Sequence, residues 1–457
     1  MVYWTVYKTI KNVRYTKCRV FQEKTLTKQL LLFPDNEFRC YTNANANKVS
    51  NGDQAFHTWY RFVLSFPPHL VREYIGRFGL KPKQTLLDPF CGTGTTLVEA
   101  KLQHLQGIGI EANKMAHFAC QVKCDWGIDV HEFLADSRMI EEVTKKRIRN
   151  TSKNRTFSSE QMELILNDSI DPLPLHRTLL LKEAIDEHDS KFKKHQLLAL
   201  ATSTVSYCSK LRFGPEVGVS QKKKTNSDAV GCWMSVIGQM GRDIQELQKN
   251  EKSRRYPVTV HFGDSRDSRQ FLKKNLIDAV FTSPPYPNEK DYTRTTRLES
   301  VLLGFLNNKA ELREMKEGLL RSNTRNVYKD DKDDEFIAHN AEVLKIAEEI
   351  EKKRIVMGKT SGFEKQYHRV VRLYFGGMAK HLESLKPFLK KGAMLGYVVG
   401  DQASFLQVHI PTGKILGDIA EHLGYQLESI NLFRTRFATA TKREMNEEVV
   451  VLRWEGK

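Results

Sequence analysis

The sequence predicts an α/β protein built on a parallel, doubly wound sheet. Short apolar runs that read as strands alternate with helical patterns on either side of a long polar stretch. Several of these runs end in an acidic or small polar residue followed by glycine or proline, which is typical of strands that lead into a ligand-binding edge. The chain has 457 residues, enough for one large domain or two ordinary ones.

The first part of the sheet is expected between residues 66 and 123. Phe66 and the two prolines after it read as a turn that enters a helix. The elements that follow are a strand ending at Asp88, a glycine turn, a helix over Thr96–Leu102, a strand over Gly107–Ile110 ending at Glu111, and a helix from Asn113 to about Lys123. This order of strand, helix, strand and helix predicts parallel pairing.

The same pattern resumes at Val258–Phe262, a predicted strand that leads into Asp264 and Ser265. The apolar run Ile277–Phe281 reads as a buried parallel strand that leads to Ser283. The sheet is expected to close with helix 366–386, strand 393–399, helix 414–423 and strand 449–453.

These patterns divide the chain into a sheet domain and three other parts. The sheet domain is expected over residues 56–128, 256–292 and 366–457, after an N-terminal extension over 1–55 with a strand-like start at Val2–Tyr7. Residues 129–255 are predicted to be a mostly helical insertion, and 293–365 a second, irregular insertion. Either insertion, or both, is a candidate for recognition of a polyanion.

Composition narrows the class of protein. The net charge of +17 suits a polyanionic partner, although a basic surface without a partner would have the same composition. The seven cysteines are an odd number without paired metal-ligand spacing, so we expect reduced thiols and no metal site. Neither a secretory leader nor a bilayer-spanning apolar run is expected, which predicts a cytoplasmic protein without a membrane partner.

Three acids stand at the ends of successive predicted strands. Asp88 precedes a turn with two glycines, which would let a ligand approach the backbone closely. A dinucleotide fingerprint would have a third glycine where Leu97 stands. Glu111 can accept both hydroxyls of a ribose, and Asp264 can meet an adenine amino group. Each acid alone could be a helix cap, but together they indicate a nucleotide-like cofactor.

The stretch Thr282–Tyr286, Thr-Ser-Pro-Pro-Tyr, forms a second candidate site. A polar side chain, two prolines and an aromatic ring at the end of a buried strand would make a rigid slot of about the size of a base. Ser283 and the Pro284 carbonyl could accept the two hydrogens of an exocyclic amino group, and Tyr286 could stack on the ring. A surface turn or a polyproline ligand is the alternative. Beside a nucleotide-like cofactor, the slot indicates methyl transfer to a nucleobase.

These two stretches resemble a known family. Asp88–Thr96 is similar to the S-adenosylmethionine motif of the amino-methylating DNA methyltransferases. Thr282–Tyr286 resembles their catalytic motif, in the form most often associated with cytosine-N4 enzymes. Leu211–Glu216 and Val398–Asp401 are also similar to segments of such enzymes, and the resemblance covers residues 56–455. It implies a Rossmann-like methyltransferase sheet with helical or irregular insertions.

The resemblance also implies roles for individual residues. S-adenosyl-L-methionine would be the cofactor, with Glu111 at its ribose. Asp264 and Ser265 would lie at its adenine. The residues implied at its methionine end are Phe66, Pro67, Asp88, Phe90, Gly92, Gly94 and Thr95. The implied catalytic residues are Ser283, Pro284, Pro285 and Tyr286.

The implied substrate is a cytosine flipped out of double-stranded DNA. The setting would be a prokaryotic restriction-modification or related defence system, with a cognate restriction endonuclease as a further candidate partner. Adenine N6 is an alternative target, as is guanine N2 of RNA, and a binder without activity could retain the fold. Cytosine-C5 transfer is excluded because none of the fourteen prolines precedes a cysteine. The cofactor motif precedes the catalytic motif, the reverse of the order common among enzymes with this catalytic core.

Overall fold

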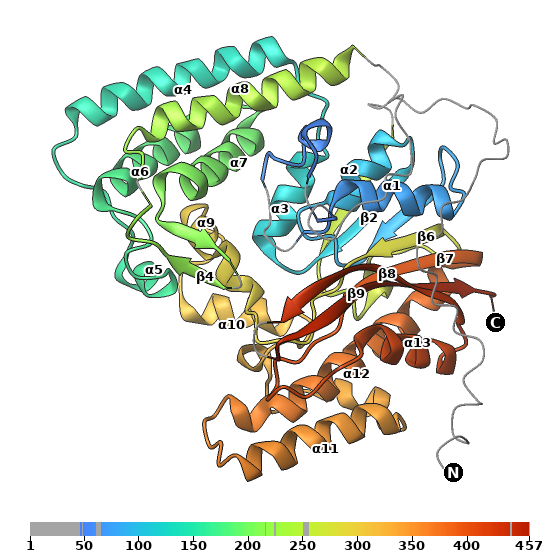
Figure 1. Cartoon of the computed structure of the whole chain (residues 1–457). Coiled ribbons are helices and arrows are strands. Elements are labelled where there is room, and N and C mark those ends of the chain that lie inside the picture. Colours follow the sequence, from blue (N-terminus) through green and yellow to red (C-terminus); the bar gives the residue numbers. More distant parts are fainter. Residues whose placement is uncertain are drawn as a thin grey trace, which may run out of the picture.

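A seven-stranded sheet with helices on both faces forms the centre of the protein, shown as a computed structural model in Figure 1. The structure describes residues 46–47, 49–60, 65–214, 216–223, 225–249, 256–438 and 441–456. The strand-like start at Val2–Tyr7 and most of the 1–55 extension lie outside these residues. The α/β prediction is confirmed by this sheet.

The strands run in the order β5-β2-β1-β6-β7-β9-β8. Their bounds are β1 (Thr85–Asp88), β2 (Gln106–Glu111), β5 (Val258–Phe262), β6 (Ile277–Thr282), β7 (Leu389–Gly400), β8 (Gln426–Ala438) and β9 (Arg443–Trp454). All pairings are parallel except those of β9, which is antiparallel to both β7 and β8.

The predicted parallel, doubly wound sheet thus has one antiparallel edge, and β8 was not among the predicted strands. β8 ends at Ala438 and β9 begins at Arg443, a connection too short for the crossover that a parallel pair requires. Most residues of β8 are half-buried or exposed, so the strand lacks the buried apolar run that marks the central strands.

Consecutive residues of the central strands face opposite layers of helices. Leu86 packs with α1 (Pro68–Arg77), whereas Leu87 packs with α12 (Tyr367–Leu385) and α13 (Thr412–His422). The same alternation holds for Val449 and Val450 of β9. The side-chain period of two thus supplies both faces of the sheet with apolar residues, as a sheet covered on both faces needs.

The remaining helices next to the sheet are α2 (Thr95–Leu102) and α3 (Lys114–Lys123). The Asn113 side chain accepts hydrogen bonds from the backbone N–H groups of Met115 and Ala116, so it caps α3. Pro68 at the first turn of α1 occupies a position where no backbone donor is needed.

A helical lobe is inserted between α3 and β5. Its elements are α4 (Val130–Asn150), α5 (Ser159–Leu164), α6 (Pro172–Glu187), α7 (Lys193–Ser203), the hairpin β3 (Leu211–Phe213) and β4 (Val217–Val219), and α8 (Ala229–Gln248). Its apolar core, including Trp233 and Leu181, is continuous with Leu97 of α2 and Met115 of α3. The lobe is therefore packed onto the sheet domain rather than joined by a linker (Figure 1).

Residues 293–365 are more regular than expected. They contain α9 (Arg297–Leu302), α10 (Lys309–Glu317) and α11 (Ala341–Val356). In α11 the buried residues Val343, Ile346, Ala347 and Ile350 recur at helical spacing among many charged residues. This narrow apolar stripe is the amphipathic signal that the sequence interpretation missed.

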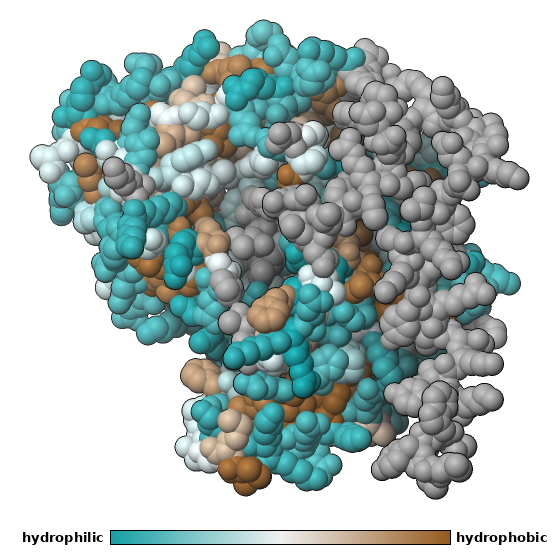
Figure 2. Space-filling model, in the orientation of Figure 1, coloured by the Kyte–Doolittle hydropathy of each residue, from teal (hydrophilic) through white to brown (hydrophobic). Residues whose placement is uncertain are grey.

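The face seen in Figure 2 is mostly hydrophilic, with hydrophobic residues in separate patches. Among the helices in the described part of the chain, none is long and apolar enough to span a bilayer.

The change of direction in the sheet positions the ligand-binding region. From β1 the chain moves outward through β2 to β5, and it then returns to β6 on the other side of β1. Parallel sheets of this kind bind ligands at such a switch point, beyond the carboxyl ends of the strands. The glycine turn follows β1 and Thr-Ser-Pro-Pro-Tyr ends β6, so the two predicted motifs meet at this point.

Candidate active site

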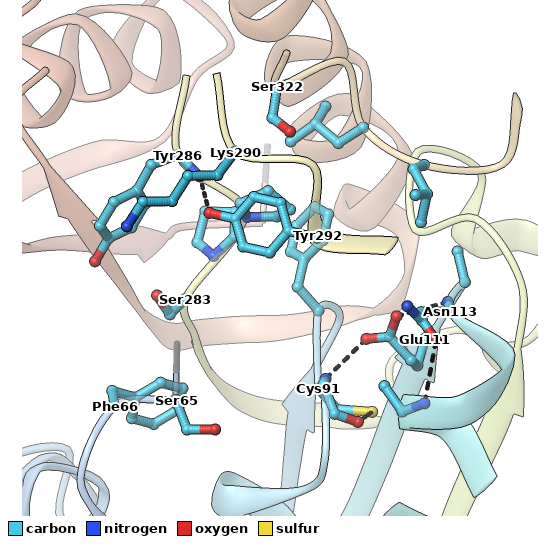
Figure 3. A pocket seen from close by; sticks show the side chains of 18 of the residues that line it. Ser65, Phe66, Cys91, Glu111, Asn113, Ser283, Tyr286, Lys290, Tyr292 and Ser322 are labelled. Carbon is cyan, nitrogen blue, oxygen red and sulfur yellow. Dashed lines mark hydrogen bonds between the residues drawn. The ribbon is translucent and has the colours of Figure 1, made fainter. Parts of the chain in front are cut away.

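A cavity of about 350 Å³ lies at the carboxyl ends of β1, β2, β5 and β6. Glu111 and Asn113 border one part of it, whereas Ser283, Tyr286 and Lys290 border another (Figure 3). The volume is within the ordinary range for small-molecule sites. Both predicted half-sites therefore open into one space.

The glycine turn after β1 is shaped by two left-handed residues. Gly92 has φ +50° and Gly94 has φ +88°. A Cβ atom at Gly94 would lie 2.6 Å from the Cys120 sulfur, whereas one at Gly92 would meet no protein atom within 4 Å. Gly94 is thus required by packing within the protein. Gly92 borders the cavity and leaves space there for a ligand.

Glu111 connects the turn to the second strand. Its carboxylate accepts the Gly92 N–H at 2.8 Å and the Asn113 N–H at 2.7 Å, one on each oxygen. Each oxygen keeps a further lone pair, so the carboxylate can still accept ribose hydroxyls. Burial raises the pKa of Glu111 to about 7, although these two N–H groups lower it.

Cofactor affinity is therefore expected to rise with pH through neutrality, because the ionised Glu111 carboxylate is the better acceptor for hydroxyls. The effect of pH on folding stability through Glu111 has the opposite sign. The folded-state pKa lies above the ordinary value of 4.5, so the contribution of Glu111 to the free energy of unfolding is largest below 4.5 and falls as the pH approaches 7. Titration calorimetry with the cofactor across neutral pH measures the first effect. A Glu111→Gln variant should lose the pH dependence, and an equally steep dependence in that variant would contradict the assignment.

Asp88 lies behind the cavity rather than in its wall. It is fully buried, and its Oδ1 accepts the Thr282 hydroxyl at 2.6 Å and the Phe90 N–H at 3.1 Å. Burial raises the pKa of Asp88 to about 6. Because Thr282 precedes Ser283, the Asp88 carboxylate connects the glycine turn directly to β6 and the Thr-Ser-Pro-Pro-Tyr stretch.

Asp264 and Ser265 border the cavity beyond the end of β5. Both oxygens of Asp264 accept hydrogen bonds from the Arg266 guanidinium, which also pairs with Asp333. The Asp264 side chain remains one-third exposed, so its free lone pairs stay accessible to a donor such as an amino group.

The Ser283 hydroxyl is oriented by the neighbouring strand. It donates to the Val398 carbonyl of β7 at 3.1 Å, so the oxygen is left with lone pairs to offer. The Tyr286 N–H donates to the Tyr292 hydroxyl at 3.1 Å, which fixes the backbone of the slot (Figure 3). Burial raises the pKa of the Tyr286 phenol well above its usual range, so the ring stays neutral.

The cavity brings together most of the predicted residues. Those that border it are Phe66, Phe90, Gly92, Thr95, Glu111, Asp264, Ser265, Ser283, Pro284, Pro285 and Tyr286. Asp88 and Gly94 support the turn from behind, and Pro67 borders a smaller adjoining cavity.

Other residues of the cavity wall were not predicted. These are Ser65, Asn113, Lys290, Arg434, Arg436 and Glu447, among others. Arg434, Arg436 and Glu447 lie on β8 and β9, and the missed β8 hid the first two. Lys290 lies four residues after Tyr286, and this closeness in sequence is the signal from which it could have been predicted. No group of three or more metal-ligating side chains occurs within the described residues.

Comparison of the sequence with known proteins finds one similar family model and several similar proteins. A family model of N6/N4 methylases, described as DNA methylase, matches residues 5–120. The Type II methyltransferase M.BsoBI of Geobacillus stearothermophilus is 26% identical over 308 residues, which cover 61% of this chain and 58% of M.BsoBI. The chain thus spans less than two thirds of that relative. The Type II methyltransferase M.AvaI of a Nostoc species is 23% identical over 420 residues, 84% of this chain and 82% of M.AvaI.

Two solved structures are also similar. TrmN from Thermus thermophilus has a TM-score of 0.29 at 10% identity, with 88% of this chain and 52% of that chain covered. The rRNA methyltransferase aviRa from Streptomyces viridochromogenes has a TM-score of 0.33 at 11% identity, with coverage of 88% and 94%.

The sheet is doubly wound and Rossmann-like, with the cavity at its switch point, and the match to a DNA methylase model indicates S-adenosyl-L-methionine as the cofactor. The residues present fit this cofactor, because Gly92 leaves space and Glu111 offers acceptors beside it. Over residues 5–120 the chain is similar to the N6/N4 DNA methylase family, and its similarity to two Type II methyltransferases agrees with the resemblance found in the sequence.

Proposed function

We propose that this protein is a Type II DNA methyltransferase that modifies the exocyclic N4 amino group of a cytosine flipped out of duplex DNA. A restriction-modification system is the setting that its Type II relatives suggest. The observation that carries the proposal is the orientation of Ser283, which borders the cavity and whose hydroxyl donates to the Val398 carbonyl, so that its oxygen can act as an acceptor.

An exocyclic amino nitrogen is a weak nucleophile because its lone pair is delocalised into the ring. Ser283 Oγ and the Pro284 carbonyl would accept its two hydrogens and draw the nitrogen toward tetrahedral geometry. Bound S-adenosylmethionine supplies an electrophilic methyl group. Holding the amino nitrogen in line with that group provides much of the rate enhancement, as is general for positioned reactants. The nitrogen would gain the methyl group as the carbon–sulfur bond of the sulfonium breaks, the sulfur would keep that electron pair as a neutral thioether, and the nitrogen would release one proton to solvent water.

Tyr286 supports the choice of a planar substrate. Its ring borders the cavity beside Ser283, and its backbone is fixed by Tyr292 (Figure 3). A neutral aromatic ring held in this position can stack on a flipped base. The form of the motif, with serine before the two prolines, favours cytosine N4 over adenine N6 through its family resemblance.

Incubation with labelled S-adenosylmethionine and mixed-sequence duplex DNA tests the proposal. After digestion to nucleosides, mass spectrometry is expected to find N4-methylcytosine. Detection of N6-methyladenine would be consistent with the same mechanism but would overturn the assignment of cytosine as the target base. Label found only in added tRNA or ribosomal RNA would overturn the assignment of DNA as the substrate. The same reaction with the Ser283→Ala variant measures the background level of methylated nucleosides in each sample.

A further inference from the structure

Three cations gather at the Tyr286 side of the cavity. They are Lys290, from the loop after β6, and Arg434 and Arg436 from β8. Figure 3 shows Lys290 beside Tyr286, on the side away from Glu111 and Asn113. The three side chains therefore lie where the substrate would enter, and not at the ribose end of the cofactor site.

These cations are held in place by the fold. The Lys290 N–H donates to the Asn288 side chain at 3.0 Å, and its carbonyl accepts from the Asn323 side chain at 3.1 Å. Arg436 donates to the Asp401 carbonyl at 2.6 Å. The backbone contacts of Lys290 fix the position of its Cα atom. Within the described part of the chain, its side-chain amine forms no ion pair.

Their charge is only partly compensated. Two carboxylates of the cavity wall lie near these cations in structure or sequence. Glu447 pairs with Arg434 and lies 3.8 Å from Arg436, whereas Asp291 pairs with Lys316. Glu289 is engaged by the N–H and hydroxyl of Thr324. Burial and the nearby Arg436 lower the pKa of Lys290, whereas Glu447 and Glu216 raise it. Burial and mutual repulsion raise the free energy of these three positive charges. A bound anion would offset that electrostatic penalty.

A nucleobase is neutral and the cofactor carries a sulfonium, so neither reactive group supplies that anion. The sugar-phosphate backbone of the substrate strand does. We propose that Lys290, with Arg434 and Arg436, binds the phosphodiester next to the flipped nucleotide and so holds the extruded base in the slot. This inference rests on the proposed function, since it needs a nucleic acid strand at the cavity.

The test uses a duplex that contains the sequence methylated by the wild-type protein. In one series of duplexes, each phosphate flanking the target base is replaced in turn by a neutral methylphosphonate. One replacement is expected to weaken wild-type binding about tenfold, the effect of losing one charged hydrogen bond. The same replacement should leave the Lys290→Met variant unchanged, because that variant has already lost the contact.

Two further variants make the result specific. Lys290→Arg should restore most of the binding because it keeps the charge. Lys274→Met is the matched control, since Lys274 is an exposed lysine before β6, at the opposite edge of the sheet. The slope of log affinity against log salt is expected to fall by about one in Lys290→Met and to stay unchanged in the control.

Independent, additive losses from Lys290→Met and every methylphosphonate would overturn the inference. Weaker cofactor binding in Lys290→Met would also overturn it, because the anion would then be the carboxylate of the cofactor. A wild-type protein that methylates no DNA would instead overturn the proposed function, so the two failures are distinguishable.

Discussion

Replacing Ser283 with alanine is expected to lower the rate of methyl transfer by at least about a hundredfold, the usual effect of deleting one preorganised hydrogen-bonding group from an active site. The variant would lose the acceptor for one amino hydrogen, and the nitrogen lone pair would stay conjugated with the ring. Cofactor affinity should change little, because the Ser283 hydroxyl donates to β7 and not to the glycine turn.

The decisive measurement is a single-turnover rate with saturating cofactor and DNA. Ser235→Ala is a suitable control, since this exposed serine of α8 donates only within its own helix. Thermal unfolding of both variants separates a catalytic loss from a folding defect, because the Val398 carbonyl also loses a donor in Ser283→Ala. A transfer rate close to that of the wild type would rule out the slot mechanism.

The second large effect is expected from Glu111→Ala, which should weaken S-adenosylmethionine binding by about a hundredfold or more. Two charge-assisted hydrogen bonds would be lost, each with a contribution of about 1.5–3 kcal/mol. The loss has two origins. The ribose hydroxyls lose their acceptor, and the N–H groups of Gly92 and Asn113 lose the carboxylate that holds the turn in its binding conformation.

Isothermal calorimetry with S-adenosylmethionine measures this effect directly. Glu111→Gln separates its two origins, because an amide keeps one acceptor oxygen but places N–H donors against a backbone N–H. We expect intermediate affinity from Glu111→Gln. Unchanged affinity in Glu111→Ala would remove this residue from the cofactor site.

The sequence was most informative where a strand is buried on both faces. The buried apolar runs of β1 and β6 were predicted, and the glycine turn and the Thr-Ser-Pro-Pro-Tyr stretch that follow them border one cavity at the same edge of the sheet. The edge of the sheet was harder to predict. β8 is half-exposed, and it contributes Arg434 and Arg436 to the cavity, so the missed strand also concealed two cationic residues of the site.

Contacts between distant segments were also inaccessible from sequence. The hydrogen bond between Asp88 and Thr282 joins residues separated by 194 positions, and the orientation of the Ser283 hydroxyl depends on a carbonyl 115 positions away. Both contacts are set by strand pairing, since β1 and β7 flank β6. No local pattern records which neighbours a central strand will have.

The pairing of β1 with β6 also bears on how such genes can be rearranged. Both strands are parallel neighbours, so the site depends on their adjacency and not on which one is translated first. A permuted gene that preserved the same strand pairing would yield the same chemistry with its motifs in the opposite order. The order of the two motifs in this protein therefore does not require a different arrangement of the site. The order is the one that a circular permutation of the gene would produce.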